Sequence, residues 1–87
     1  MMYNVTFTKQ DLKQLKKLDK FTQSTIYQWI VNNLDGTDNP RLHGKGLTAN
    51  HSGQWRYRVG DYRVLANIIE DQIVIEIFTI GHRRDIY

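Results

Sequence analysis

The length of 87 residues leaves room for one small hydrophobic core, which excludes a multidomain enzyme. Hydrophobic residues make up 40% of the chain and charged residues 24%, a balance that favours a compact folded domain over a disordered one. The net charge of +3 points weakly to polyanionic partners, and the lack of cysteine excludes disulfides and thiolate metal sites.

The N-terminal half predicts one strand and then a helical hairpin. Apolar and polar residues alternate from Tyr3 to Phe7, the period of a half-buried strand. Thr8 is a candidate N-cap for a helix over residues 9–18, in which leucines recur at helical spacing, and a second helix is expected over residues 22–34. Residues 35–54 hold the only proline and four glycines and show no sustained period, so we expect a long loop there.

The C-terminal half predicts three strands joined by short turns. From Gln54 apolar residues alternate with polar ones up to Gly60-Asp61, a two-residue hairpin signal, and the alternation resumes over Tyr62–Ile68. Glu70-Asp71 is expected to turn the chain into a third strand that carries isoleucines at every second position.

The predicted order is therefore β-α-α-β-β-β in one domain over residues 1–87. We expect a two-layer α+β fold in which the helical hairpin packs on a mainly antiparallel four-stranded sheet.

The turn at Gly60-Asp61 predicts the register of the first hairpin. Arg58 would lie opposite Arg63 and Arg56 opposite Leu65, so that three arginines share one face. Like charges directly opposite each other destabilise a sheet by a few tenths of a kcal/mol or more. A fold that keeps this arrangement is expected to use it as an anion site, although a solvated polar face is the simpler alternative.

Glu76 is the acid that this register brings into question. A two-residue turn at Glu70-Asp71 would place Glu76 opposite Leu65, in the same row as Arg56. In that position the carboxylate would be either a salt-bridge partner or a chemical group.

Three segments of the sequence form a recognisable combination. They are Pro40-Arg41-Leu42-His43-Gly44, Trp55-Arg56-Tyr57-Arg58-Val59-Gly60-Asp61-Tyr62-Arg63-Val64 and Gly81-His82-Arg83-Arg84-Asp85-Ile86-Tyr87. Together they resemble the signature of the RelE branch of the RelE/ParE toxin superfamily, and the match spans nearly the whole chain. The resemblance implies the same β-α-α-β-β-β order. It also implies a bacterial toxin, neutralised by a cognate antitoxin, that enters the ribosomal A site and cleaves mRNA there.

The reaction implied by the resemblance is attack of a ribose 2′-hydroxyl on the adjacent phosphate, without a metal or other cofactor. Such a reaction needs a base for the 2′-hydroxyl, cations for the extra charge on the phosphorane and an acid for the leaving oxygen. By motif, the resemblance assigns this site to five residues: Arg56, Arg58, Arg63, Arg83 and Tyr87. Arg63 and Arg83 would hold the scissile phosphate, and Tyr87 would stack on a base or orient the nucleophile. We expect further RNA contacts from Lys45, Arg41 and Arg84.

The general base stays open at this point. Some family members have lysines at the positions of Arg56 and Arg58, and arginine does not give up a proton near neutral pH. The remaining candidates are His82, Tyr87 and Glu76, of which the first two are favoured.

Two other functions are compatible with the sequence. One is a non-enzymatic inhibitor like the gyrase-poisoning ParE branch, against which the retained arginines count. The other is a degenerate toxin that acts only as a binding partner of its antitoxin.

The remaining expectations concern partners and location. The longest apolar stretch is interrupted by Glu76 and Thr79, so we expect a cytoplasmic protein without a membrane contact. The three histidines lie too far apart in the sequence to suggest a metal site, and no small-molecule ligand is expected.

Overall fold

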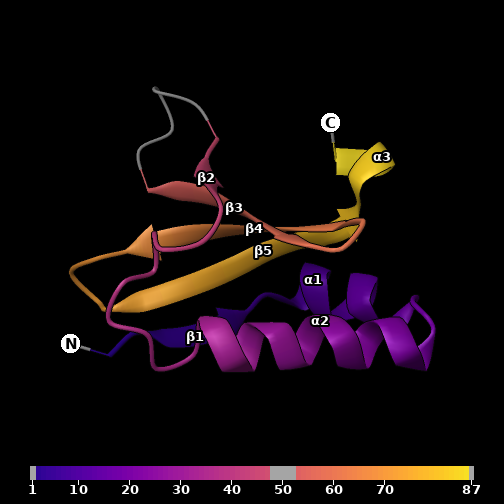
Figure 1. Cartoon of the computed structure of the whole chain (residues 1–87), viewed down its shortest axis with the longest axis horizontal. Helices are drawn as coiled ribbons and strands as arrows, with labels where there is room; N and C mark the ends of the chain where they lie inside the picture. The colour runs from indigo at the N-terminus through magenta and orange to yellow at the C-terminus, as the bar shows by residue number, and fades with distance from the viewer. Residues whose placement is uncertain (1, 48–52, 87) are drawn as a thin grey trace.

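The computed structural model describes residues 2–47 and 53–86 and has two layers. One layer is a five-stranded sheet, and the other consists of helices α1 and α2, which cover one face of that sheet (Figure 1). The elements in chain order are β1 (Asn4–Phe7), α1 (Lys9–Lys16), α2 (Lys20–Asn33), β2 (Lys45–Gly46), β3 (Gln54–Val59), β4 (Tyr62–Ile69), β5 (Val74–His82) and α3 (Arg83–Ile86). Within the two described ranges, no helix is both long and apolar enough to cross a membrane.

The predicted α+β class is confirmed, with one strand (β2) and one short helix (α3) more than expected. The strand order is β1-β5-β4-β3-β2, in which β1 pairs with β5 in parallel and all other pairs are antiparallel. The additional strand, β2, comes from the segment expected to be a loop, where Lys45 pairs with Arg56 and Gly46 with Trp55. A two-residue strand leaves no period in a sequence, because its existence depends on the neighbouring strand.

The predicted helical hairpin is also present, and side-chain caps fix its helix starts. The Thr8 hydroxyl oxygen accepts from the backbone N–H of Asp11 at 3.3 Å, as expected of an N-cap. Asp19 caps α2 through the backbone N–H of Thr22 at 3.0 Å, so this helix begins at Lys20, earlier than predicted. The two helices are therefore separated by a short turn centred on residues 17–19.

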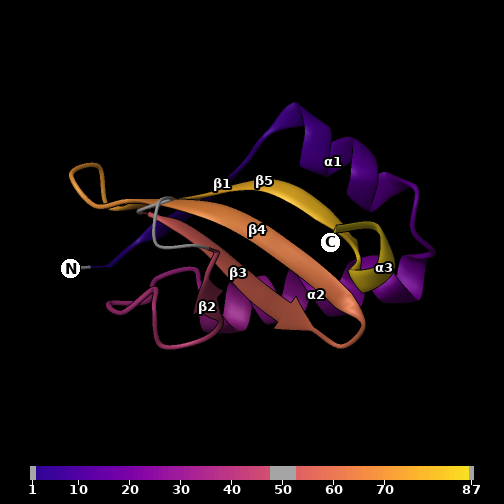
Figure 2. The ribbon, with the colours of Figure 1, turned by 90° about the horizontal axis from the view of Figure 1, so that it is seen from above.

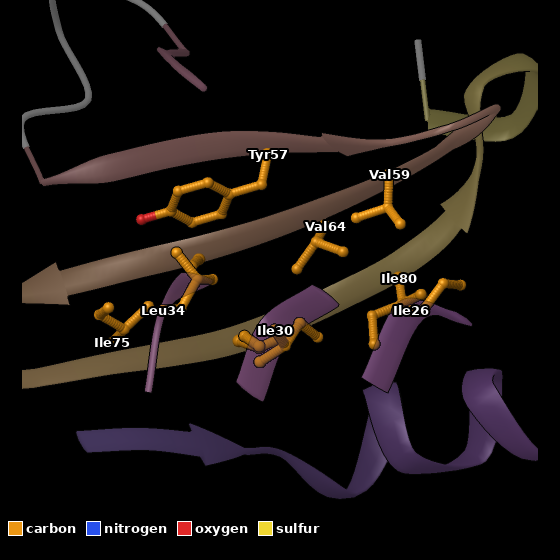
Figure 3. Close-up of a cluster of buried hydrophobic side chains, with 10 residues drawn as sticks. Ile26, Ile30, Leu34, Tyr57, Val59, Val64, Ile75 and Ile80 are labelled. Carbon is orange, nitrogen blue, oxygen red and sulfur yellow. The ribbon is translucent and has the colours of Figure 1, made fainter. Parts of the chain in front are cut away.

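The core lies between α2 and the middle of the sheet. Buried side chains from α2, β3, β4 and β5 meet there, as Figure 3 shows; the labelled members are Ile26, Ile30, Leu34, Tyr57, Val59, Val64, Ile75 and Ile80. Helix α2 runs below β3 and β4, while α1 lies along β5 (Figure 2). The opposite face of the sheet, called the outer face below, carries the side chains that alternate with this core along β3, β4 and β5.

The first hairpin has the predicted register, and the second does not. Arg58 pairs with Arg63 and Arg56 with Leu65, as the two-residue turn requires. The expectation that Glu76 lies opposite Leu65 is wrong, because four residues (70–73) connect β4 to β5 and a bulge follows between Leu65 and Ala66. Glu76 instead pairs with Asn67, and Leu65 pairs with Thr79.

Candidate nucleic-acid interface

Three arginines lie on the outer face, on the two adjacent strands β3 and β4. Arg56 and Arg58 alternate with the buried Tyr57 and Val59, so their side chains leave β3 on the side away from α2. Arg63 belongs to the same face because it pairs with Arg58. The predicted convergence of guanidinium groups on one side of the sheet therefore holds at the level of strand register.

Arg63 is unusual for a cation because only 5% of its surface is exposed. Its Nη1 donates to the carbonyl oxygen of Tyr62 at 3.2 Å and to that of Gly60 at 3.4 Å. Burial of a charge is costly unless hydrogen bonds compensate it. These contacts hold the guanidinium at the β3–β4 turn in one orientation, which a phosphate-binding arginine requires.

Lys45 extends the cationic surface to the edge of the sheet. It pairs with Arg56, and together with Gly44 and Arg58 these two side chains line a hollow of about 220 Å³. Three cations around a hollow of this size offer a site for an anionic group such as a phosphate. Lys45, predicted to contact RNA, thus lies beside the arginines.

The segment before Lys45 is tied to β3 by two side-chain hydrogen bonds. Trp55 Nε1 donates to the carbonyl oxygen of His43 at 2.6 Å, and the Tyr57 hydroxyl donates to that of Pro40 at 2.6 Å. Burial raises the pKa of the Tyr57 hydroxyl above its ordinary value, so this group stays protonated and remains a donor. The core therefore positions the loop that delivers Lys45 to the outer face.

Gly44 makes this close approach possible. Its φ is +78°, and a Cβ at this position would lie 2.2 Å from the carbonyl oxygen of Arg56 and 2.9 Å from Trp55 Nε1. Any side chain would push the loop away from β3. The glycine of the Pro40–Gly44 segment is thus required for the hollow beside Lys45.

Arg83 lies at the same end of the sheet as Arg63. It begins α3, its backbone N–H donates to the carbonyl oxygen of Asp61 at 2.8 Å, and its Nε is 3.9 Å from Asp61 Oδ1. Both side chains are more than half exposed, so this ion pair is weak and leaves Arg83 available to a ligand. Figure 1 shows α3 on the side of the sheet opposite α1 and α2, and Arg84 also belongs to α3.

Arg41 lies away from the arginines of β3 and β4. Its Nη2 is 2.7 Å from Glu70 Oε1, and its guanidinium carbon is 5.8 Å from the centre of the Trp55 ring. Glu70 follows the last residue of β4, whereas Arg63 is the second, so they are about 23 Å apart along the strand. Arg41 instead lines a second hollow, of about 610 Å³, at the far end of β4.

Of the three candidate bases, only Glu76 is placed by the structure on the same face of the sheet as the arginines. Gly81 pairs with Arg63, so its neighbour His82 lies on the other face, where its ring meets Tyr62 edge-on at 5.4 Å. His82 Nδ1 accepts from the backbone N–H of Arg84 at 3.2 Å. Glu76 is on the outer face, one row beyond Arg56, and Tyr87 lies outside the described residues.

Sequence reasoning left two outer-face residues unused. Gln54 and Asn67 pair with each other, and Asn67 Nδ2 donates to Glu76 Oε1 at 3.4 Å. The parity of each strand already placed Gln54 on the same face as Arg56. Their relation to Glu76 had no sequence signal, because it depends on the length of the β4–β5 turn.

Comparison with known proteins identifies the relatives of this chain. The family model described as ParE toxin of type II toxin-antitoxin system, parDE, matches residues 5–87. Toxin RelG of Mycobacterium tuberculosis is 30% identical over 87 residues, which cover 100% of this chain and 98% of that protein.

Solved structures give the same picture for the fold. The toxin–antitoxin complex RelBE2 of Mycobacterium tuberculosis includes a chain with a TM-score of 0.83 and 26% identity, covering 95% of this chain and 100% of that one. A mutant of Escherichia coli toxin RelE in the free state has a TM-score of 0.79 at 19% identity, covering 99% of this chain and 88% of that one. With a family model and a curated toxin that both match along nearly the whole sequence, the chain belongs to the RelE/ParE superfamily and is a toxin of a type II toxin–antitoxin system.

Proposed function

We propose that this toxin is a ribosome-dependent endoribonuclease that cleaves mRNA and thereby inhibits translation. The observation that supports it is the cationic outer face, where Arg56, Arg58 and Arg63 share one side of adjacent strands and Lys45 lines a hollow beside them. A dense set of guanidinium groups fits a phosphodiester, which each guanidinium can hold through two parallel hydrogen bonds.

In the proposed reaction the 2′-oxygen of the ribose bonds to phosphorus and the bond from phosphorus to the 5′-oxygen breaks. The 2′-hydroxyl loses its proton to a base, and the 5′-oxygen gains one as it leaves. Arg63 is held in one orientation by backbone carbonyls and is nearly buried, so it would act on the phosphorane through its fixed positive charge. Arg58 and Arg83, both exposed, would contact the same phosphate group.

No strong base adjoins these arginines within the described residues, which makes dependence on the ribosome reasonable. His82 turns toward Tyr62, and Glu76 is hydrogen-bonded to Asn67 one row away. A ribosome that aligns the 2′-hydroxyl in line with the leaving oxygen would supply much of the rate enhancement by orientation alone. Tyr87→Phe and His82→Gln, assayed in parallel, distinguish the two favoured bases.

Cleavage on programmed ribosomes tests the function. Arg58→Ala and Arg63→Ala are each expected to reduce the cleavage rate about 100-fold, the usual cost of removing one preorganised donor to a developing charge. Lys13→Ala is the matched control, since it removes one positive charge from the exposed surface of α1 on the opposite layer. An intact message with the wild-type toxin, or equal cleavage by all four proteins, would reject the proposal.

We also propose a protein antitoxin as partner, because several similar solved structures are complexes of RelE-type toxins with RelB antitoxins. Helix α2 exposes Phe21 at 80% and Tyr27 at 48%, and Tyr27 lines a hollow of about 410 Å³ with Leu15 and Lys20. An exposed aromatic side chain beside a hollow is typical of an interaction site. Co-purification with the product of an adjacent reading frame, and its loss in Tyr27→Ser, tests this partner.

A second function is favoured by the name of the matching family model, which is a ParE toxin. Under this alternative the toxin inhibits DNA gyrase without cleaving RNA. A supercoiling assay with purified gyrase separates the two functions, since inhibition together with an intact message supports the alternative. A toxin that cleaves no message, does not inhibit gyrase and does not arrest growth when it is expressed, but still binds its antitoxin, would have only the binding role.

A further inference from the structure

We propose that Gln54, Asn67 and Glu76 form a base-reading row on the outer face, which selects a nucleotide whose base has an exocyclic amino group. The inference rests on the proposed endoribonuclease function and specifies its substrate preference. The row consists of the side chains that register places next to one another on β3, β4 and β5.

The row runs parallel to the arginines at the distance of one nucleotide. Gln54 precedes Arg56 by two residues, so their side chains leave β3 about 7 Å apart on the same face. Gln54, Asn67 and Glu76 are each partly exposed, which leaves them accessible from the outer face. When the arginines hold a phosphate, the base attached to a neighbouring ribose comes to lie over this row.

The composition of the row opposes the local preference of a sheet. Asparagine is depleted in strands, yet Asn67 lies within β4, which is flanked by β3 and β5. Residues that violate a local rule in an otherwise consistent fold are typical of functional positions. The Asn67 amide is also held in place, since its Nδ2 donates to Glu76 Oε1 at 3.4 Å.

Asn67 also borders a space large enough for a nucleobase. It lines the hollow of about 610 Å³ at the end of β4, together with Gly53, Glu70 and Arg41. The planar guanidinium of Arg41 lies over the Trp55 ring at 5.8 Å and provides a flat cationic group at the rim. A base at the mouth of the hollow therefore meets Asn67, and Glu76 is the residue paired with Asn67 on the neighbouring strand.

The hydrogen-bonding capacity of the row determines which bases it accepts. An ionised carboxylate only accepts hydrogen bonds, and within the described ranges the second carboxylate oxygen of Glu76 has no hydrogen-bond partner. The amino groups of adenine, cytosine and guanine can donate to this oxygen. Uracil presents a carbonyl oxygen at the corresponding position, and this oxygen would be repelled.

Cytosine and uracil provide the sharpest comparison because cytosine carries an amino donor at position 4 where uracil carries a carbonyl acceptor, with the opposite exchange at N3. Messages that differ only in this base, beside the mapped cleavage site, are cleaved on programmed ribosomes, and kcat/KM is compared. The wild-type toxin is expected to prefer cytosine about tenfold. Glu76→Gln is expected to abolish or reverse this preference, because its amide N–H can donate to the uracil oxygen.

Asp38→Asn is the matched control, since it neutralises an exposed carboxylate outside the row and is expected to keep the wild-type preference. Glu76→Gln is nearly isosteric, and an unchanged melting temperature shows that it is folded. Asn67→Ala, which removes the amide that holds Glu76, is expected to weaken the preference as well. If both variants keep the wild-type preference while cleaving RNA, the base-reading row is refuted alone; if the wild-type toxin cleaves no message, the proposed function falls and the row with it.

Discussion

Replacement of Tyr57 by phenylalanine removes a single buried hydroxyl and tests how the loop that carries Lys45 is held. The Tyr57 side chain is 0% exposed, and its hydroxyl donates to the carbonyl oxygen of Pro40 at 2.6 Å, across 17 positions in the sequence. Proline has no backbone N–H, so this carbonyl is the only polar backbone group that Pro40 can satisfy. The variant keeps the ring in the core and leaves the acceptor unpaired.

The expected cost follows from this geometry. A buried acceptor that loses its partner costs about 1–3 kcal/mol. In a domain of this length, each kcal/mol corresponds to a shift in melting temperature of about 4–8 °C. We therefore expect Tyr57→Phe to melt at least about 4 °C below the wild type, with a parallel loss in the free energy of unfolding from urea titration.

Tyr27→Phe is the control, because the Tyr27 side chain is 48% exposed and lies on α2, away from Pro40. Its free energy of unfolding is expected to stay within about 0.5 kcal/mol of the wild type, as for most surface changes. If Tyr57→Phe is as stable as Tyr27→Phe, the Tyr57–Pro40 bond does not anchor the loop.

Two further substitutions test the loop and the N-terminal helix. Gly44→Ala is expected to reduce the free energy of unfolding by more than about 1 kcal/mol, because its φ is +78° and its Cβ would collide with the backbone of β3. Gly60→Ala is the control, since Gly60 has φ +59° but open space around it and shares only the backbone strain. Equal losses in the two variants would contradict the close approach of the loop to β3. Asp11 is buried, and desolvation raises the pKa of its carboxyl above 3.8, so its contribution to stability is present below pH 3.8 and is lost as the pH rises through the folded-state pKa. Asp11→Asn should lack this loss, so the stability of the variant relative to the wild type should increase as the pH rises above 3.8 in urea titrations; a difference that does not change with pH would refute it.

Local patterns were sufficient for the elements that bring the arginines together. The alternation on both sides of Gly60-Asp61 predicted the register of β3 and β4, because a two-residue hairpin turn permits one pairing. The face shared by Arg56, Arg58 and Arg63 follows from that pairing and from the period of a strand. Helices α1 and α2 were likewise predictable, since an apolar stripe is encoded within a few residues, whereas the start of α2 at Lys20 and the short helix α3 were not expected.

Contacts between distant segments determined the rest of the site. Glu76 lies beside Asn67 because the β4–β5 connection has four residues, and the length of that connection has no distinct residue pattern. Lys45 joins the outer face because the buried Tyr57 and the partly buried Trp55 hold the preceding loop against β3. The period of a sequence indicates which side of a helix or strand is apolar. The pairing of strands depends also on turn length, bulges and side-chain packing across the whole chain. The positions of Glu76 and Lys45 are therefore determined only when the sheet is assembled.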